Sequence, residues 1–94
     1  MYDENITLYL KDNPDVEAIL PDAQQAIKTA FGDVGVTFRF ICDPEDGTCH
    51  LGVYIQTPLD VPEARTCLEQ FYRAWWFNQA KSLFGKLVFQ LDFI

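Results

Sequence analysis

The residues most able to do chemistry in this 94-residue chain lie around one acidic loop. Cys42 and Cys49 flank residues 43–48, so their side chains can face each other across two paired strands. Such a pair suits a redox dithiol, or half of a metal site completed by the neighbouring His50. Against both, His50 has the opposite strand parity from Cys49 and points to the other face of a sheet. The chain also contains no Cys-x-x-Cys and no second histidine.

We therefore interpret the cysteines as structural, because cysteine is among the most often buried residues and packs as a small hydrophobic side chain. Cys67 lies on the apolar stripe of a predicted helix and has the same interpretation. The N-terminal residues 1–5 are acidic, and no apolar stretch of a signal peptide follows them. An odd number of cysteines in such a chain predicts three free thiols and a cytoplasmic protein.

The remaining polar residues form no recognisable catalytic set. Asp43, Glu45 and Asp46 carry oxygen ligands that suit Ca²⁺, but their loop is half the length of an EF-hand loop and lacks its alternating ligands. A solvated turn explains them more simply. No Ser-His-Asp set, phosphate-binding glycine loop or zinc spacing can be assembled from the chain. We predict no catalytic residue, no metal and no cofactor.

The charge excludes two classes of partner. Fourteen acidic residues against seven basic ones give a net charge of −7, which opposes binding to nucleic acid and to anionic membranes. The longest apolar run, residues 74–77, is far shorter than the roughly 20 residues of a membrane span. We expect neither nucleic acid nor a membrane as a partner.

Apolar periodicity predicts the elements that position these residues. Alternation predicts strands over residues 6–10, 36–42, 49–56 and 87–93. Helical spacing predicts one helix from Asn13 to Gly32, disturbed at Pro21, and a second from Asp60 to near Phe77. The order β-α-β-β-α-β predicts a single α+β domain over residues 1–94. Its expected form is a ferredoxin-like sandwich, with two helices on one face of a four-stranded antiparallel sheet.

The other face of that sheet is predicted to be open and to bind a partner. It mixes tyrosines and β-branched apolar residues with few charges, whereas a merely solvated face is richer in Lys and Glu. We predict a homodimer through this face, with Tyr9, Arg39, His50 and Tyr54 as binding residues. Strand parity assigns the following residues to it: Thr7, Tyr9, Thr37, Arg39, Ile41, His50, Tyr54, Gln56, Val88, Gln90 and Asp92.

An alternative interface lies on the second predicted helix. Tyr72 and Trp76 share one flank of it, and aromatic residues are enriched at interface cores. A covering loop over residues 78–86 is the other interpretation of these rings. An RNA-binding sheet is not favoured, since only Lys11 and Arg39 accompany Tyr9 and Tyr54.

The loop sequence Asp43-Pro44-Glu45-Asp46, the strand after it and the capped helix reaching Phe71 and Trp75-Trp76 resemble a group of small uncharacterised bacterial proteins. The resemblance covers residues 6–93 and implies a bacterial cytoplasmic protein, but no activity. The predicted function is a non-enzymatic binding or self-assembling module, with a second copy or another protein as partner. The alternatives are a small enzyme and a small-ligand regulatory domain, each with a site formed at a dimer interface.

Overall fold

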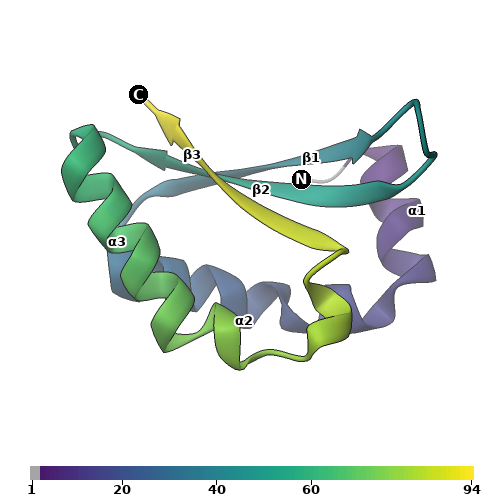
Figure 1. Cartoon of the computed structure of the whole chain (residues 1–94), viewed down its shortest axis with the longest axis horizontal. Coiled ribbons are helices and arrows are strands. Elements are labelled where there is room, and N and C mark those ends of the chain that lie inside the picture. The colour runs from purple at the N-terminus through teal and green to yellow at the C-terminus, as the bar shows by residue number, and fades with distance from the viewer. Residues whose placement is uncertain (1–2) are drawn as a thin grey trace.

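A computed structural model describes residues 3–94 (Figure 1). Helices α2 and α3 pack against each other below one face of a three-stranded sheet, and α1 lies at the end of the sheet beside the β1–β2 hairpin. The elements in chain order are α1 (Glu4–Asp12), α2 (Pro14–Phe31), β1 (Gly35–Cys42), β2 (Cys49–Thr57), α3 (Val61–Ala74), the 3₁₀ turns η1 (Trp76–Asn78) and η2 (Lys81–Leu83), and β3 (Leu87–Phe93).

The predicted first strand is wrong, because residues 4–12 form helix α1. The Asp3 carboxylate accepts a hydrogen bond from the Ile6 N–H and caps the helix. Ile6 and Leu10, four residues apart, are buried, whereas Leu8 is exposed. A short run of alternating apolar residues fits either a strand or a helix, and here the cap and the i, i+4 pair decide for the helix.

The predicted four-stranded antiparallel sheet is therefore also wrong, although the chain is α+β. The sheet has the order β1-β2-β3, with β1 antiparallel and β3 parallel to β2. Without an N-terminal strand, β3 occupies the place next to β2. A crossover through α3 returns the chain in the same direction, which makes the β2–β3 pair parallel.

The other predicted elements form close to their expected positions. Residues 36–42 and 49–56 pair as a hairpin, as the turn residues between them indicated. Helix α2 continues through Pro21 and ends at Phe31, followed by the C-cap Gly32, whose positive φ of 86° suits glycine. Helix α3 ends at Ala74, before the expected Phe77, and the short turns η1 and η2 follow it.

The core lies between the sheet and the helices. Its centre is an aromatic cluster in which Phe89 of β3 contacts Phe71 and Trp76, with ring centroids 4.8 and 4.9 Å apart. The buried side chains of β2 and β3 have one parity, so this face of the sheet turns toward the helices. No helix within residues 3–94 is both long and apolar enough to cross a bilayer. The strand residues buried in this core are Leu51, Val53, Ile55, Leu87 and Phe89.

Candidate functional site

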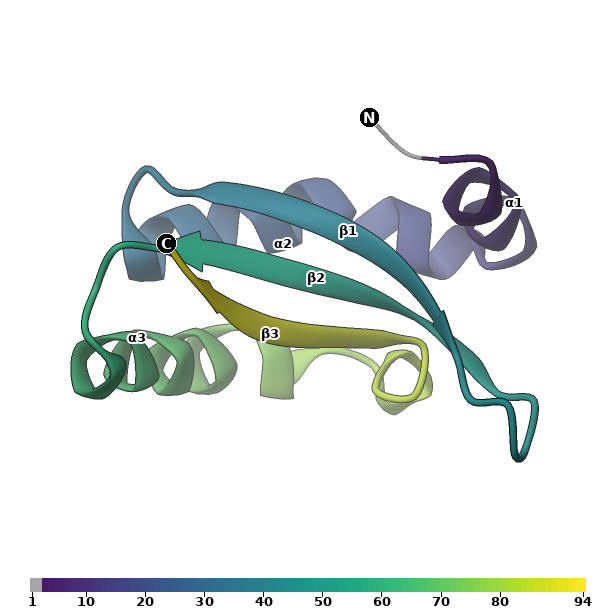
Figure 2. The ribbon, with the colours of Figure 1, turned by 90° about the horizontal axis from the view of Figure 1, so that it is seen from above.

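The face of the sheet that turns away from the helices is open, and Figure 2 looks onto it. Arg39, His50 and Tyr54, three of the four predicted binding residues, lie on this face by strand parity. Their side chains are exposed or half-buried, whereas the β2 residues of the opposite parity, Leu51, Val53 and Ile55, are buried. The complete set on this face is Gly35, Thr37, Arg39, Ile41, His50, Gly52, Tyr54, Gln56, Val88, Gln90 and Asp92.

A compact cluster occupies the middle of this face. The Arg39 guanidinium carbon lies 5.0 Å from the centroid of the Tyr54 ring, within the range of a cation–π contact. Beneath them is Gly52, the cross-strand partner of Arg39. A Cβ atom on Gly52 would lie 2.9 Å from Tyr54 Cε1 and 3.0 Å from Ile41 Cδ1. The tyrosine ring and the isoleucine therefore lie directly on the glycine backbone.

Gly52 is the member of this cluster that the sequence interpretation missed. A glycine in the interior of a strand is itself a signal that another group approaches the backbone closely. Here the approaching group is the ring of Tyr54, two residues along the same strand. The absence of a side chain at Gly52 thus positions both Tyr54 and Ile41.

The charges of this face are balanced. Arg39 and Asp92 are its two residues with a full charge, and they have opposite signs. The net charge of −7 therefore arises from residues elsewhere on the chain. His50 lies toward the hairpin end, half-buried and opposite Ile41, and Val88 of β3 pairs with Gly52.

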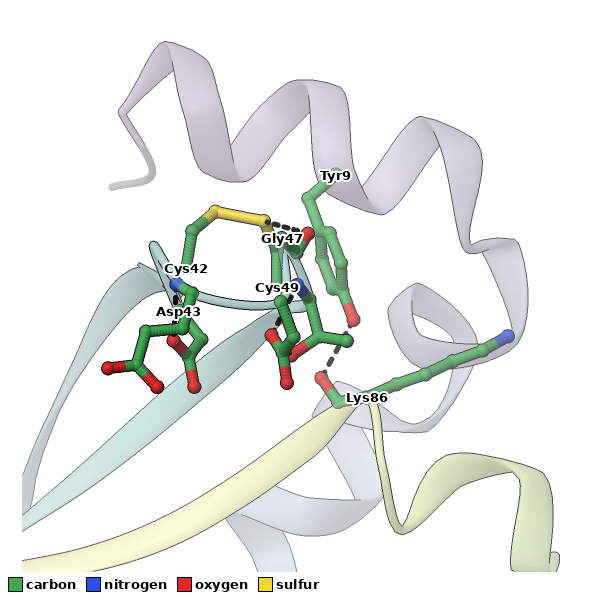
Figure 3. The surroundings of a disulfide bond; sticks show 9 residues. Tyr9, Cys42, Asp43, Gly47, Cys49 and Lys86 are labelled. Carbon is green, nitrogen blue, oxygen red and sulfur yellow. Dashed lines mark hydrogen bonds between the residues drawn. A yellow bond between two sulfur atoms is a disulfide. The ribbon is translucent and has the colours of Figure 1, made fainter.

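Tyr9 does not lie on the open face, because α1 is a helix. Its hydroxyl donates a hydrogen bond to the Lys86 carbonyl at 2.9 Å, and its ring centroid lies 5.6 Å from that of Phe40 (Figure 3). The Lys86 ammonium group in turn lies 3.0 Å from an Asp15 carboxylate oxygen. Tyr9 therefore joins α1 to the segment that leads into β3. Burial, and secondly the negative charge of Asp15, raise the pKa of the Tyr9 hydroxyl.

This raised pKa predicts a loss of stability in alkaline solution. The unfolded chain releases the Tyr9 proton at pH about 10, before the folded protein does, so stability is complete below that pH and falls above it. Tyr9→Phe is expected to lower the free energy of unfolding by about 1 kcal/mol at neutral pH, through loss of the hydrogen bond. The deficit should shrink above pH ~10. Denaturant unfolding of the wild type and Tyr9→Phe, at neutral pH and above pH ~10, measures both free energies of unfolding. A difference between the two proteins that stays the same at both pH values would contradict the prediction.

Tyr72 and Trp76, the alternative predicted interface, do not form a shared surface. Because α3 ends at Ala74, Trp76 turns into the core, where it is only 8% exposed and contacts Phe84 and Phe89. The Tyr72 hydroxyl donates a hydrogen bond to the Phe89 carbonyl at 3.4 Å. Burial raises the pKa of this hydroxyl.

Phe77 is the exposed ring of this segment, at 62% exposure, and it stacks on Tyr72. The aromatic side chains of this segment therefore mostly contact other residues of the chain. Among them, Phe77 is the one with most of its surface exposed.

The prediction of three free thiols is also contradicted. Cys42 and Cys49 form a disulfide at the loop end of the hairpin (Figure 3). Cys67 is free and half-buried. The two cysteines are direct cross-strand partners with Cα atoms 4.0 Å apart, which places their sulfur atoms in contact. Among residues 3–94, no three His, Cys, Asp or Glu side chains are grouped so as to hold a metal ion.

Two grooves lie away from the open face. One, of about 430 Å³, lies between α2 and the start of β1 and is lined by residues such as Gln24, Lys28 and Asp33. The other, of about 360 Å³, lies between α2 and α3 and is largely apolar, with Ala30 and Trp75 among its residues. Neither lining includes a His, Cys or Ser side chain, and neither includes a predicted site residue.

Comparison with known proteins adds no assignment. No family model matches this chain, and no curated protein or solved structure is significantly similar to it. The function is accordingly inferred from the geometry of the described residues.

Proposed function

We propose that this protein is a non-enzymatic binding module that pairs with a second copy of itself through the open face of the sheet. The observation that supports this most is the cluster of Arg39 and Tyr54 on Gly52. Arginine and tyrosine are enriched among residues that contribute most to interface affinity. Because the ring rests on the backbone of Gly52, little rotamer freedom remains for it to lose on binding.

Electrostatics favours a second copy on this face over other surfaces of the molecule. Two copies that each carry a net charge of −7 repel each other when acidic surfaces meet. On the open face the single Arg39 charge and the single Asp92 charge cancel. Self-association through a two-fold axis uses the same patch on both copies, so a charge-balanced patch with apolar Ile41 and Val88 suits it.

The test is sedimentation of the wild-type protein and a Tyr54→Glu variant. The wild type is expected to be dimeric at roughly tens of micromolar. Tyr54→Glu is expected to weaken the dimer by about 30-fold or more, because it removes a central ring and places a charge in the interface. Gly52→Ala, which moves the same ring away from the sheet, should weaken the dimer less.

Leu8→Glu is the matched control, because it introduces the same charge at an exposed apolar residue on α1. It should leave the dimer intact. A monomeric wild type at these concentrations would contradict the proposal, as would equal loss of the dimer in the Leu8→Glu control. Circular dichroism of each variant separates lost association from lost folding.

The placement of Arg39 and His50 on the same face favours one second candidate. A dimer through this face would enclose both side chains, so a small anionic ligand could bind between the copies. A ligand that binds only the native state raises the melting temperature. Thermal unfolding across a panel of anionic metabolites would detect this function, and loss of the shift in Arg39→Ala would locate it.

We propose the cytoplasm of a bacterium as the compartment, on the basis of the resemblance to small bacterial proteins. Stable disulfides are rare there, and those that occur are mostly transient or redox-sensing. The Cys42–Cys49 bond is compatible with this compartment only if it is reversible.

A further inference from the structure

We propose that Cys42 and Cys49 form a reversible redox site that exchanges with small-molecule thiols and disulfides, and that the neighbouring acidic loop slows this exchange for anionic ones such as glutathione. This inference does not depend on the function proposed for the open face. The disulfide lies at the loop end of the β1–β2 hairpin, next to the exposed residues 43–48 and on the side that faces α1 (Figure 3). Cys42 is exposed and Cys49 is half-buried, so a thiol from solution can reach the bond.

The backbone around the two cysteines does not depend on the bond. Seven other residue pairs, from Gly35–Gln56 to Ile41–His50, hold the register of β1 and β2. Beyond the cysteines, the Asp43 N–H donates to the Thr48 carbonyl at 2.8 Å and continues the ladder. The hairpin therefore keeps the two sulfur atoms adjacent in both redox states, and reduction leaves the protein folded.

The bond also links residues that are already close along the chain. The sequence separation is only seven residues, so the bond restricts the unfolded chain less than one that joins distant segments. The buried core residues, such as Ile55 and Phe71, belong to other parts of the fold. A contribution to overall stability is thus a weaker explanation for this bond than redox exchange.

The exchange is an ordinary thiol–disulfide reaction. A thiolate attacks the Sγ atom of the exposed residue Cys42, the Cys42–Cys49 bond breaks, and its electron pair leaves on Cys49 Sγ. A second thiolate then attacks the small-molecule sulfur of the mixed disulfide and releases Cys42 as a thiolate. The two cysteine thiolates take protons from water. Overall, two thiols are oxidised to one disulfide while Cys42 and Cys49 are reduced, and the reverse reaction restores the bond.

The charge of the loop selects among thiols. Asp43, Glu45 and Asp46 lie in the exposed segment next to the bond. The Asp43 carboxylate accepts a hydrogen bond from the Glu45 N–H, and the Asp46 carboxylate accepts hydrogen bonds from the Thr48 N–H and hydroxyl. Asp43 and Asp46 therefore also shape the turn. The exposed Glu45 side chain does not shape the turn in this way, so it affects the disulfide through its negative charge. The thiolate of glutathione carries further negative charge, so it is repelled more strongly than the singly charged thiolate of 2-mercaptoethanol.

The first experiment counts reactive thiols before and after reduction. Unreduced wild type, unfolded in denaturant, should show one reactive thiol, and three after reduction. The folded Cys67→Ala variant is then incubated with reduced glutathione and alkylated, and its intact mass is measured by mass spectrometry. Two alkyl groups should be added while circular dichroism remains native, and oxidised glutathione should remove this reactivity.

Two results would overturn the proposal. In one, excess reduced glutathione leaves the bond intact in the folded protein and opens it only after denaturation, which would make the bond structural. In the other, excess oxidised glutathione never joins Cys42 and Cys49. The unaltered wild type provides the same readouts if Cys67→Ala fails to fold, with one additional alkyl group.

Glu45→Gln tests the role of charge without altering the turn. It should raise the rate of reduction by glutathione about two-fold and the rate with 2-mercaptoethanol by a smaller factor. Equal changes with both thiols would contradict charge selection. High salt should produce the same increase in the wild-type protein, because it screens exposed charges.

Discussion

Leu10→Ala is expected to lower the free energy of unfolding by about 2–5 kcal/mol, whereas Leu8→Ala should change it by less than about 0.5 kcal/mol. Leu10 is 2% exposed and belongs to the core, and Leu8, two residues earlier, is 52% exposed. In a strand the two side chains would point to the same face and both would be buried. The pair therefore distinguishes the helix α1 from the predicted strand.

Urea unfolding followed by tryptophan fluorescence measures both values from the midpoint and the slope. Equal losses from Leu8→Ala and Leu10→Ala would contradict the helix. Ile6→Ala provides a second check, since Ile6 lies one helical turn before Leu10 and is also buried. Ile6→Ala should lower the free energy of unfolding by about as much as Leu10→Ala does.

Trp76→Ala is expected to lower the free energy of unfolding by about 3–5 kcal/mol, and Phe77→Ala by less than about 1 kcal/mol. The Trp76 ring is enclosed by Phe84 and Phe89, so its loss leaves a cavity at the centre of the aromatic cluster. Phe77 is mainly exposed and loses little more than its stacking on Tyr72. Thermal or urea unfolding of the two variants gives the comparison, with Trp75 as the remaining fluorophore in Trp76→Ala.

The same pair of variants tests the alternative interface on this segment. If Trp76 were an interface residue, Trp76→Ala would weaken self-association and leave the monomer stable. The structure predicts the opposite, a destabilised monomer. A Trp76→Ala protein as stable as the wild type would place this ring outside the core.

The parts of the fold that the sequence determined are those whose signals are local. The β1–β2 hairpin follows from two alternating strands and the turn residues between them, and α2 follows from Pro14 at its start and Gly32 at its end. The parity of β1, β2 and β3 was also correct, because one buried face requires a period of two. Parity alone is sufficient to place Arg39, His50 and Tyr54 on the same face of the sheet.

Tertiary structure decided where local signals were ambiguous. The N-terminal alternation fitted two secondary structures, and burial of Ile6 and Leu10 against the rest of the core selected the helix. That choice removed Tyr9 from the open face and made β3 the direct neighbour of β2, to which it is parallel.

Three details of the site likewise required the three-dimensional arrangement. The end of α3 at Ala74 turned Trp76 inward, since a helical wheel applies only while the helix continues. The contact of Tyr54 with Gly52 depends on a side-chain position that no periodicity specifies. The Cys42–Cys49 bond depends on register, because a shift of one residue would place the two sulfur atoms on opposite faces of the sheet.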